Sequence, residues 1–125
     1  MDVEVATRES REVVDITERV QATLQPDAKA AVVFCAHTTC AVTTADLDPG
    51  TDQDLLDAVE QMIPKLDYRH PHDPGHVWTH IASSLIGPSV TVPVKDGKLV
   101  LGSWQRIVLV ELDGPRKRNL IVTSL

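Results

Sequence analysis

The sequence predicts an α+β fold: a single compact domain over residues 1–125, mostly antiparallel β-sheet with about three helices. Its length is that of one domain with its own core. Segments with helical periodicity are interspersed among the strands of the first two thirds of the chain. The last third contains successive strand patterns and turn signals.

The N-terminal part alternates between strand-like and helix-like patterns. Residues 3–14 alternate apolar with polar or charged side chains, which predicts one or two half-buried strands. Residues 15–24 change to a helical period, and Asp15 with Glu18 predicts a capping box. The nearly all-apolar residues 29–37 predict a central strand buried on both faces, and residues 40–47 continue as a second short strand.

Two further helices are expected. Residues 48–63 read as a turn followed by a helix that ends at Pro64, and residues 76–88 as a helix with a stop signal at Gly87–Pro88. The expected apolar stripes are Leu55, Leu56, Val59, Met62 and Ile63 in the first helix, and Val77, Ile81 and Leu85 in the second.

The C-terminal segment is expected to be β-structure. Asp96–Gly97 between two alternating runs predicts a hairpin. Strands from Trp104 to Leu112 and from Lys117 to Ser124 flank a turn at Asp113–Gly114–Pro115.

Composition excludes several classes of function. A net charge of −6 argues against a nucleic-acid partner, because the basic cluster at residues 115–119 is too short to follow a phosphate backbone. No apolar run approaches the roughly 18 residues of a membrane-spanning helix, and the charged N-terminus is no signal peptide, so the expected location is the cytoplasm. Aromatic side chains are scarce, which suggests a core completed by association between copies.

Residues 68–80, YRHPHDPGHVWTH, hold four of the five histidines. These histidines bind a metal, act in acid–base chemistry, or are solvated loop residues. His72, between Pro71 and Asp73, is expected to be solvated. His76 and His80 are spaced i,i+4, a good geometry for a divalent metal, but Val77 rules out the HExxH metalloprotease pattern. His80 is either a satisfied structural histidine or points into a cleft.

The fifth histidine, His37, ends an apolar strand and therefore needs a partner. Either it makes a structural hydrogen bond or it belongs to a site. Cys35 and Cys40 bracket it and fit neither a CxxC redox pair nor a zinc finger. We expect them to be small buried residues of a strand pair, with a role in the site as the alternative.

An ordered set of motifs resembles the YjbQ family, whose members carry the name secondary thiamine-phosphate synthase. The resemblance runs from about residue 16 to the C-terminus. Its pieces are HTTCAVTTADLDPGTDQDL, YRH and HIASSLIGPSVTVPVKDGKLVLGSWQRIVLVELDGPRKR.

The resemblance implies a homotrimer with a polar pocket at or near the subunit boundary. It also implies that His37, His70 and His80 come together and hold a divalent metal: zinc, with magnesium or manganese as alternatives. The implied ligand is a small phosphorylated molecule. The remaining candidates are Thr38, Thr39, Ser83 and Arg116 as ligand-binding residues, and Glu111, Asp54 and Gln105 as catalytic residues.

Alternatives stay open for several of these positions. Asp54 either accepts a hydrogen bond from a ligand imidazole or complements a helix dipole. Glu111 is either paired with an arginine, Arg116 or Arg118, or faces the site. His76 stands where the family often has Asn or Asp and therefore competes with His70 as a third ligand.

The chain also departs from the family pattern. Ala45-Asp46-Leu47 replaces an Asn-Glu-Asn segment, which puts ligand contacts from those amides in doubt. The activity implied by the resemblance joins a pyrimidine methyl diphosphate to a thiazole phosphate, as a weak or side activity. The alternatives are a metal-dependent hydrolase of a small phosphorylated or acyl substrate, and a non-enzymatic metal- or ligand-binding oligomer.

Overall fold

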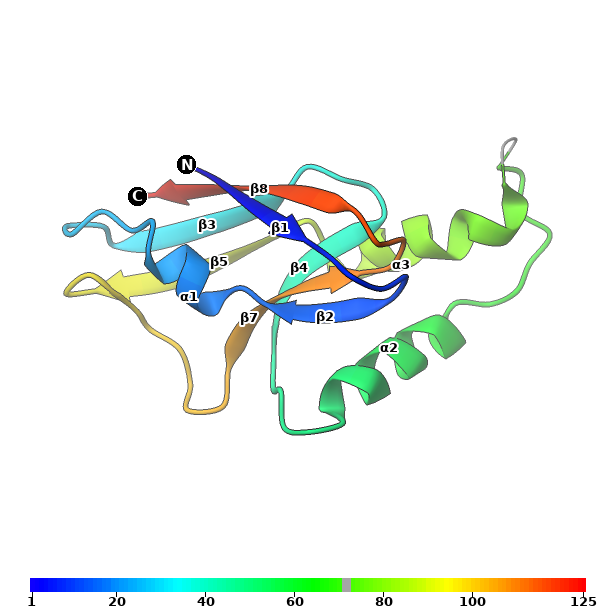
Figure 1. Cartoon of the computed structure of the whole chain (residues 1–125), viewed down its shortest axis with the longest axis horizontal. Coiled ribbons are helices and arrows are strands. Elements are labelled where there is room, and N and C mark those ends of the chain that lie inside the picture. The colour runs from blue at the N-terminus through cyan, green and yellow to red at the C-terminus, as the bar shows by residue number, and fades with distance from the viewer. Residues whose placement is uncertain (71–72) are drawn as a thin grey trace.

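Two antiparallel sheets and a pair of helices form three layers in the computed structural model, which describes residues 1–70 and 73–125 (Figure 1). The first sheet has the strand order β1-β8-β3-β5-β6 and the second has the order β2-β7-β4. The strands are β1 (Asp2–Ala6), β2 (Glu12–Asp15), β3 (Ala30–Cys35), β4 (Cys40–Ala45), β5 (Ser89–Lys95), β6 (Lys98–Leu99), β7 (Arg106–Glu111) and β8 (Lys117–Ser124). The helices are α1 (Thr17–Gln21), α2 (Thr51–Met62) and α3 (Val77–Ile86), the last preceded by a 3-10 turn at Pro74–His76.

This architecture confirms the predicted α+β class with mostly antiparallel strands and three helices. The strands expected near the N-terminus, at 40–47 and at the C-terminus are all present. The hairpin at Asp96–Gly97 is also present: both residues have positive φ, 51° and 76°, as a type I′ turn requires.

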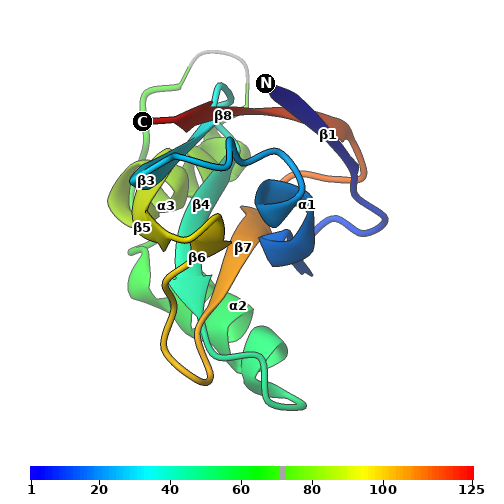
Figure 2. The ribbon, with the colours of Figure 1, turned by 90° about the vertical axis from the view of Figure 1, so that its left-hand side faces the viewer.

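The molecule has two cores, one on each side of the three-stranded sheet. Side chains such as Val33, Leu109 and Leu120 fill the space between the two sheets, where α1 closes one end (Figure 2). On the other face, Val108 and Val110 pack with Leu56 of α2 and Ala82 of α3.

Strand β7 is buried on both faces along most of its length, because it is the central strand of the middle layer. Ile107 and Leu109 face the first sheet, while Val108 and Val110 face the helices. The prediction that residues 29–37 are buried on both faces is therefore wrong. β3 is central in its sheet, but only one of its faces is covered, and Phe34 is 41% exposed on the other.

The predicted capping box of the first helix is also wrong. Asp15 ends β2, and its carboxylate accepts a hydrogen bond from Thr17 N at 3.0 Å. Glu18 does not reach back to the chain; instead it pairs with Arg106 at 3.0 Å. Helix α1 is consequently a single short turn of five residues held by the buried Ile16 and Val20.

The later helices lie where the sequence predicted, but the expected stripes are partly misplaced. Met62 of α2 and Leu85 of α3 are 73% and 69% exposed. In α3 the buried positions are instead Thr79, Ala82 and Ser83. Among the described residues no helix is long and apolar enough to cross a membrane.

Candidate functional site

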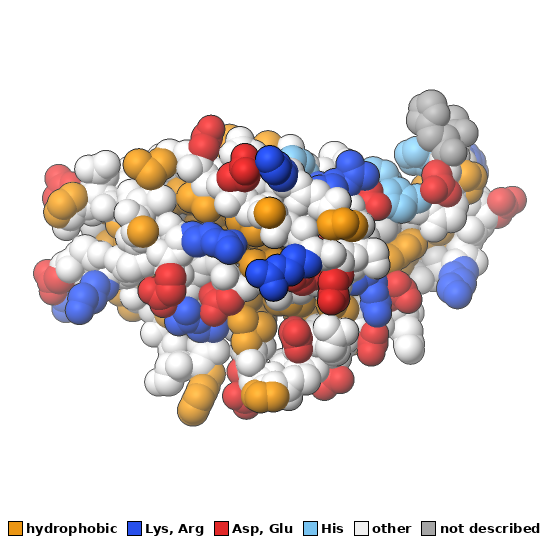
Figure 3. Space-filling model, in the orientation of Figure 1, with side chains coloured by type: hydrophobic (Ala, Val, Ile, Leu, Met, Phe, Trp, Pro, Cys, Tyr) orange, Lys and Arg blue, Asp and Glu red, His pale blue; other side chains and the backbone are white. Residues whose placement is uncertain are grey.

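Three segments meet at the end of the sheets beside α3: the loop between β3 and β4, the start of α3, and the turn between β7 and β8. They enclose a hollow of about 460 Å³. In Figure 3 histidine side chains gather beside basic and acidic ones at this end of the molecule. The lining residues are Ala36, His37, Thr38, Thr39, His76, His80, Asp113, Arg116 and Arg118.

A buried ion pair lies beside the hollow, which its arginine, Arg118, lines. Glu111, at the end of β7, is fully buried, and Arg118 of β8 is nearly so. Arg118 Nε donates to Glu111 Oε1 at 2.9 Å and Nη2 donates to Oε2, a bidentate pair. Burial alone would raise the pKa of Glu111, but the hydrogen bonds from Arg118 and Thr7 hold that pKa below its ordinary value.

This ion pair also fixes the β3–β4 loop. Arg118 Nη2 donates to Thr39 Oγ1 at 2.8 Å and to the Thr39 carbonyl at 3.2 Å. On the other side Thr7 Oγ1 donates to Glu111 at 2.7 Å. Thr39, Glu111 and Arg118 therefore hold the loop in place under the site.

His37, in that loop, is half-buried and has one nitrogen engaged. Its Nε2 accepts a hydrogen bond from the backbone N–H of Asn119 at 3.0 Å. In the neutral ring the proton must then reside on Nδ1, which becomes a donor. Burial and the charge of Arg118 lower the pKa of His37, so the neutral form is favoured.

His80 is held through its Nδ1 atom, whereas His37 is held through Nε2. Its Nδ1 lies 3.1 Å from the carbonyl oxygen of Thr38. A carbonyl only accepts, so Nδ1 carries the proton, and the neutral ring leaves Nε2 as an acceptor or ligand. The ring stacks on His70 at 5.4 Å between centroids and meets the edge of His76 at 5.7 Å.

Asp113 links His76 to Arg116. His76 Nε2 lies 2.9 Å from Asp113 Oδ1, and Arg116 Nη2 donates to Asp113 Oδ2 at 2.6 Å. Partial burial opposes the ionised carboxyl, but these two hydrogen bonds hold the pKa of Asp113 below its usual value. Arg116 remains more than half exposed, so its guanidinium still faces solvent over the hollow.

A smaller adjoining hollow of about 270 Å³ shares His37, Thr38 and His80. Ser83 and Cys40 also line it. Ser83 Oγ is buried and, among the described residues, has no hydrogen-bond partner. A buried hydroxyl of this kind is satisfied at little cost by a bound water or ligand.

Two of the predicted catalytic residues lie elsewhere. Asp54 is exposed in the first turn of α2 and does not line either hollow. Gln105 precedes β7, while Glu111 ends it, roughly 20 Å away at about 3.3 Å per residue. Gln105 instead binds Thr44 Oγ1 at 3.0 Å and lines a separate surface hollow with Asp46 and Trp104.

Of the predicted metal ligands, only His80 has the hydrogen bonding of one. His37 and His70 each accept a backbone N–H at one nitrogen, from Asn119 and Asp73. In each neutral ring the other nitrogen then carries the proton. A metal could bind at that nitrogen only if the proton moved and the hydrogen bond from the backbone were lost. Within residues 1–70 and 73–125, no group of three or more His, Cys, Asp or Glu side chains is positioned to hold a metal ion. His72 lies outside the described residues.

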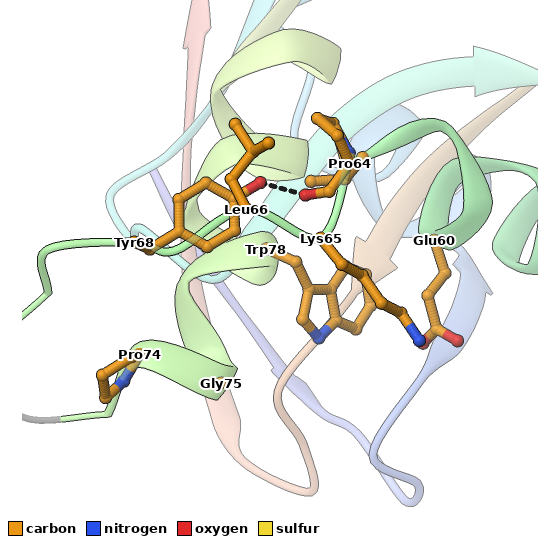
Figure 4. Close-up of a pocket in the computed structure, with 9 residues that line it drawn as sticks. Glu60, Pro64, Lys65, Leu66, Tyr68, Pro74, Gly75 and Trp78 are labelled. Atoms are coloured by element: carbon orange, nitrogen blue, oxygen red, sulfur yellow. Dashed lines mark hydrogen bonds between the residues drawn. The ribbon is translucent and has the colours of Figure 1, made fainter.

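A different hollow, of about 400 Å³, is lined in part by other residues of the histidine-rich segment (Figure 4). It lies beside the end of α2 and the start of α3, and the rings of Tyr68 and Trp78 line it. Tyr68 Oη donates to the carbonyl of Pro64, which folds this segment back on itself. None of the histidines that the structure describes lines this hollow.

Two contacts of the site were not predicted from the sequence. Asp113 was expected only as a turn residue, yet it joins His76 to Arg116. The link from Arg118 to Thr39 was also missed. Of the alternatives left open for Glu111, the structure shows pairing with Arg118, as a buried carboxylate requires a cationic partner.

The fold and the hollow at the histidines define a class of protein. It is a small α+β domain with a polar site of imidazole and guanidinium groups at one end of its sheets. The family described as "UPF0047 protein YjbQ-like" matches residues 1–125. A UPF0047 protein of Archaeoglobus fulgidus is 36% identical over the full length of both chains. The UPF0047 protein YugU of Bacillus subtilis is 35% identical, covering 98% of this chain and 96% of its own.

Solved structures agree with this result. A conserved hypothetical protein from Thermus thermophilus superposes with a TM-score of 0.90 at 34% identity, covering 100% of this chain and 99% of its own. An uncharacterised YjbQ/UPF0047 protein from Clostridium acetobutylicum gives a TM-score of 0.88 at 34% identity, with the same coverage. The chain belongs to the YjbQ/UPF0047 family. The resemblance inferred from the sequence motifs is confirmed.

Proposed function

We propose that the hollow between His37, His76, His80 and Arg116 binds a small phosphorylated molecule. We further propose that the protein carries a thiamine-phosphate-synthase-like activity there, as a weak or side reaction. One observation supports the ligand class above the others. A chain with net charge −6 concentrates two arginines and three histidines around one hollow, whose lining among the described residues includes a single carboxylate.

The available hydrogen-bond donors match phosphate oxygens. His37 Nδ1–H, the hydroxyl of the exposed Thr38 and the outer guanidinium edge of Arg116 all donate. Asp113 is paired with the guanidinium of Arg116, so it adds little repulsion toward an anion. Ser83 Oγ supplies a further polar contact in the adjoining hollow.

These groups suit a reaction in which a diphosphate leaves. In the proposed reaction a pyrimidine methyl diphosphate is joined to a thiazole phosphate and pyrophosphate is released. Donors that are fixed beforehand stabilise the charge that develops on the departing oxygens. His76 is the proposed proton donor, because Asp113 Oδ1 lies 2.9 Å from its Nε2 and holds the ring at the hollow. Glu111 acts only through Arg118, as a positioning residue for the loop.

Calorimetric titration with inorganic pyrophosphate tests the binding step. We expect saturable binding that weakens by about tenfold or more in Arg116→Ala, the loss of a charged hydrogen bond to the ligand. Arg19→Ala is the matched control, because it removes the same charge from an exposed position of helix α1 and should bind like the wild type. Equal affinities in all three proteins would contradict the proposal.

An assay for the joined product, detected by mass spectrometry, tests the reaction separately. Binding without product would make the protein a ligand-binding oligomer and remove the synthase from the proposal.

A metal-dependent hydrolase is the second candidate, and the hydrogen bond between His80 and the Thr38 carbonyl favours it. This bond orients a ligand imidazole with Nε2 free. A divalent ion, zinc or else magnesium or manganese, would supply Lewis acidity toward a phosphoryl or acyl group. His80, with His70 or His76 and with His37 after exchange of its hydrogen bond, would hold the ion.

Bound metal per chain, measured on untagged protein, tests this second candidate. Near-stoichiometric zinc that is lost in His80→Ala would support it. No metal above background after incubation with zinc or manganese would exclude it.

We also propose a cytoplasmic homotrimer whose pocket is at or near the subunit boundary. The family resemblance and the scarcity of aromatic core residues support this assembly. Phe34 and Ile121, paired in register between β3 and β8, both remain more than a third exposed. Within one chain, Gln105 lies far from the histidines. In an assembly, Gln105 of a second chain could lie beside them.

A further inference from the structure

Cys35 and Cys40 form a close pair of thiols at the base of the site. Cys35 ends β3 and Cys40 begins β4, so the pair brackets the four-residue loop that carries His37, Thr38 and Thr39. Both cysteines are free and 1% exposed, and their Sγ atoms lie 2.7 Å apart.

We propose that Cys35 and Cys40 are a redox modification site that peroxide converts to an intramolecular disulfide. A disulfide bond is about 2.0 Å long, so joining the sulfurs requires them to approach by only about 0.7 Å. Cys35 is the last residue of β3 and Cys40 the first of β4, and ladders to β8 and β7 hold these strands in place. The bond would close the smallest loop of the site without moving either strand by more than a fraction of an ångström.

The surroundings give a small oxidant a path to the pair. Cys40 lines the hollow of about 270 Å³ that opens beside His37 and Ser83. Cys35 Sγ lies on the inner side, 3.8 Å from the Cys40 carbonyl. A molecule as small as hydrogen peroxide fits this hollow, whereas a protein thiol does not reach two sulfurs that are 1% exposed.

The chemistry balances with peroxide as the oxidant. The first sulfur attacks one peroxide oxygen, breaks the O–O bond, becomes a sulfenic acid and releases one water. The second sulfur then attacks the first, forms the S–S bond and displaces that oxygen as a second water. Two thiols are oxidised by two electrons, one peroxide is reduced to two waters, and a dithiol reductant reverses the change.

The disulfide would change the site because of what the loop carries. His37 is positioned by Asn119, Thr39 by Arg118, and the Thr38 carbonyl by His80. A covalent closure between residues 35 and 40 tightens the ends of this segment. The inference does not depend on which ligand or reaction the site serves.

Mass spectrometry of the intact protein, before and after stoichiometric hydrogen peroxide, tests the inference. We expect the wild type to lose the mass of two hydrogens and both iodoacetamide-reactive thiols of the denatured chain, and to recover both with dithiothreitol. Peptide mapping should find residues 35 and 40 joined in one chain. Cys35→Ser and Cys40→Ser are matched controls that keep one thiol each and should gain oxygen instead.

Other outcomes would overturn the inference. These are two thiols that remain after treatment, a crosslinked dimer, or over-oxidised sulfur without a Cys35–Cys40 bond. The wild-type result decides by itself if either serine variant fails to fold. Faster exchange of the amides of residues 36–39 in the oxidised protein would argue against tightening of the loop.

Discussion

Glu111 and Arg118 form a salt bridge in which both side chains are buried, and Arg118 holds the site loop through Thr39. Both are buried and make several charge-assisted hydrogen bonds to each other. Removing one partner of such a pair leaves an uncompensated charge in the interior. The pair therefore couples the stability of the fold to the position of His37.

We expect Glu111→Gln to lower the free energy of unfolding by about 3–5 kcal/mol, the usual cost of breaking a buried ion pair. Asp57→Asn is the control, because it removes an equivalent contact with Arg11 at the surface, where the cost is about 0–1 kcal/mol. Urea denaturation of both variants measures the difference. Similar small losses in both would mean that the Glu111–Arg118 pair contributes no more than a surface contact.

The same carboxylates predict how stability depends on pH. Folding lowers the pKa of Glu111 and of Asp113, so the folded protein binds fewer protons there than the unfolded chain. Their contribution is complete above the ordinary carboxyl range, at about pH 4, and is lost as the pH falls through that range toward the folded pKa values. We expect the unfolding free energy to drop as the pH falls below about 5, less steeply in Glu111→Gln. Equal slopes would contradict this assignment.

At the scale of elements, local patterns could be predicted and layer positions could not. Strand β8 lies within the predicted bounds because its alternation is local to the chain. The burial of β7 on both faces, and the exposed face of β3, depend on which strand occupies the middle layer. Apolar runs of similar length do not distinguish these positions.

The helix faces show the same limit. Spacing by four residues, as in Val77, Ile81 and Leu85, drifts around a helix of about 3.6 residues per turn. Leu85 therefore leaves the buried face, where Ala82 and Ser83 remain.

This difference gives a direct test on α2 and α3. We expect Leu56→Ala to destabilise by about 2–5 kcal/mol, because Leu56 is fully buried under the three-stranded sheet. Leu85→Ala, at a site that is 69% exposed, should change stability by no more than about 0.5 kcal/mol. Thermal or urea unfolding compares the two variants. A larger loss of stability in Leu85→Ala than in Leu56→Ala would contradict the burial of Leu56 in the core.

For the molecule as a whole, the family and fold could be predicted from the ordered motifs, and the site in part. The sequence pointed to His37, His80, Arg116 and the threonines at the hollow. It could not predict that Asp113 joins His76 to Arg116, because contacts between distant segments leave no periodic pattern. The predicted strand from Trp104 to Leu112 already placed Gln105 near its start and Glu111 near its end, as the structure does.

The proposed assembly is tested by the mass of the protein in solution. Light scattering on the size-exclusion peak should give three times the 13.7 kDa of one chain. The peak should keep this mass on dilution to low micromolar concentration, as expected for copies that complete each other's cores. A mass equal to one chain would contradict the trimer and remove the subunit boundary from the proposal.

The most direct test of the central claim is to follow the histidine ring nitrogens by NMR while inorganic pyrophosphate is added. We predict saturable shifts of the His37, His76 and His80 signals, with no comparable change of the Trp78 indole in the separate hollow of Figure 4. Histidine signals that do not move, or shifts confined to Trp78, would contradict a phosphate-binding site at the histidines.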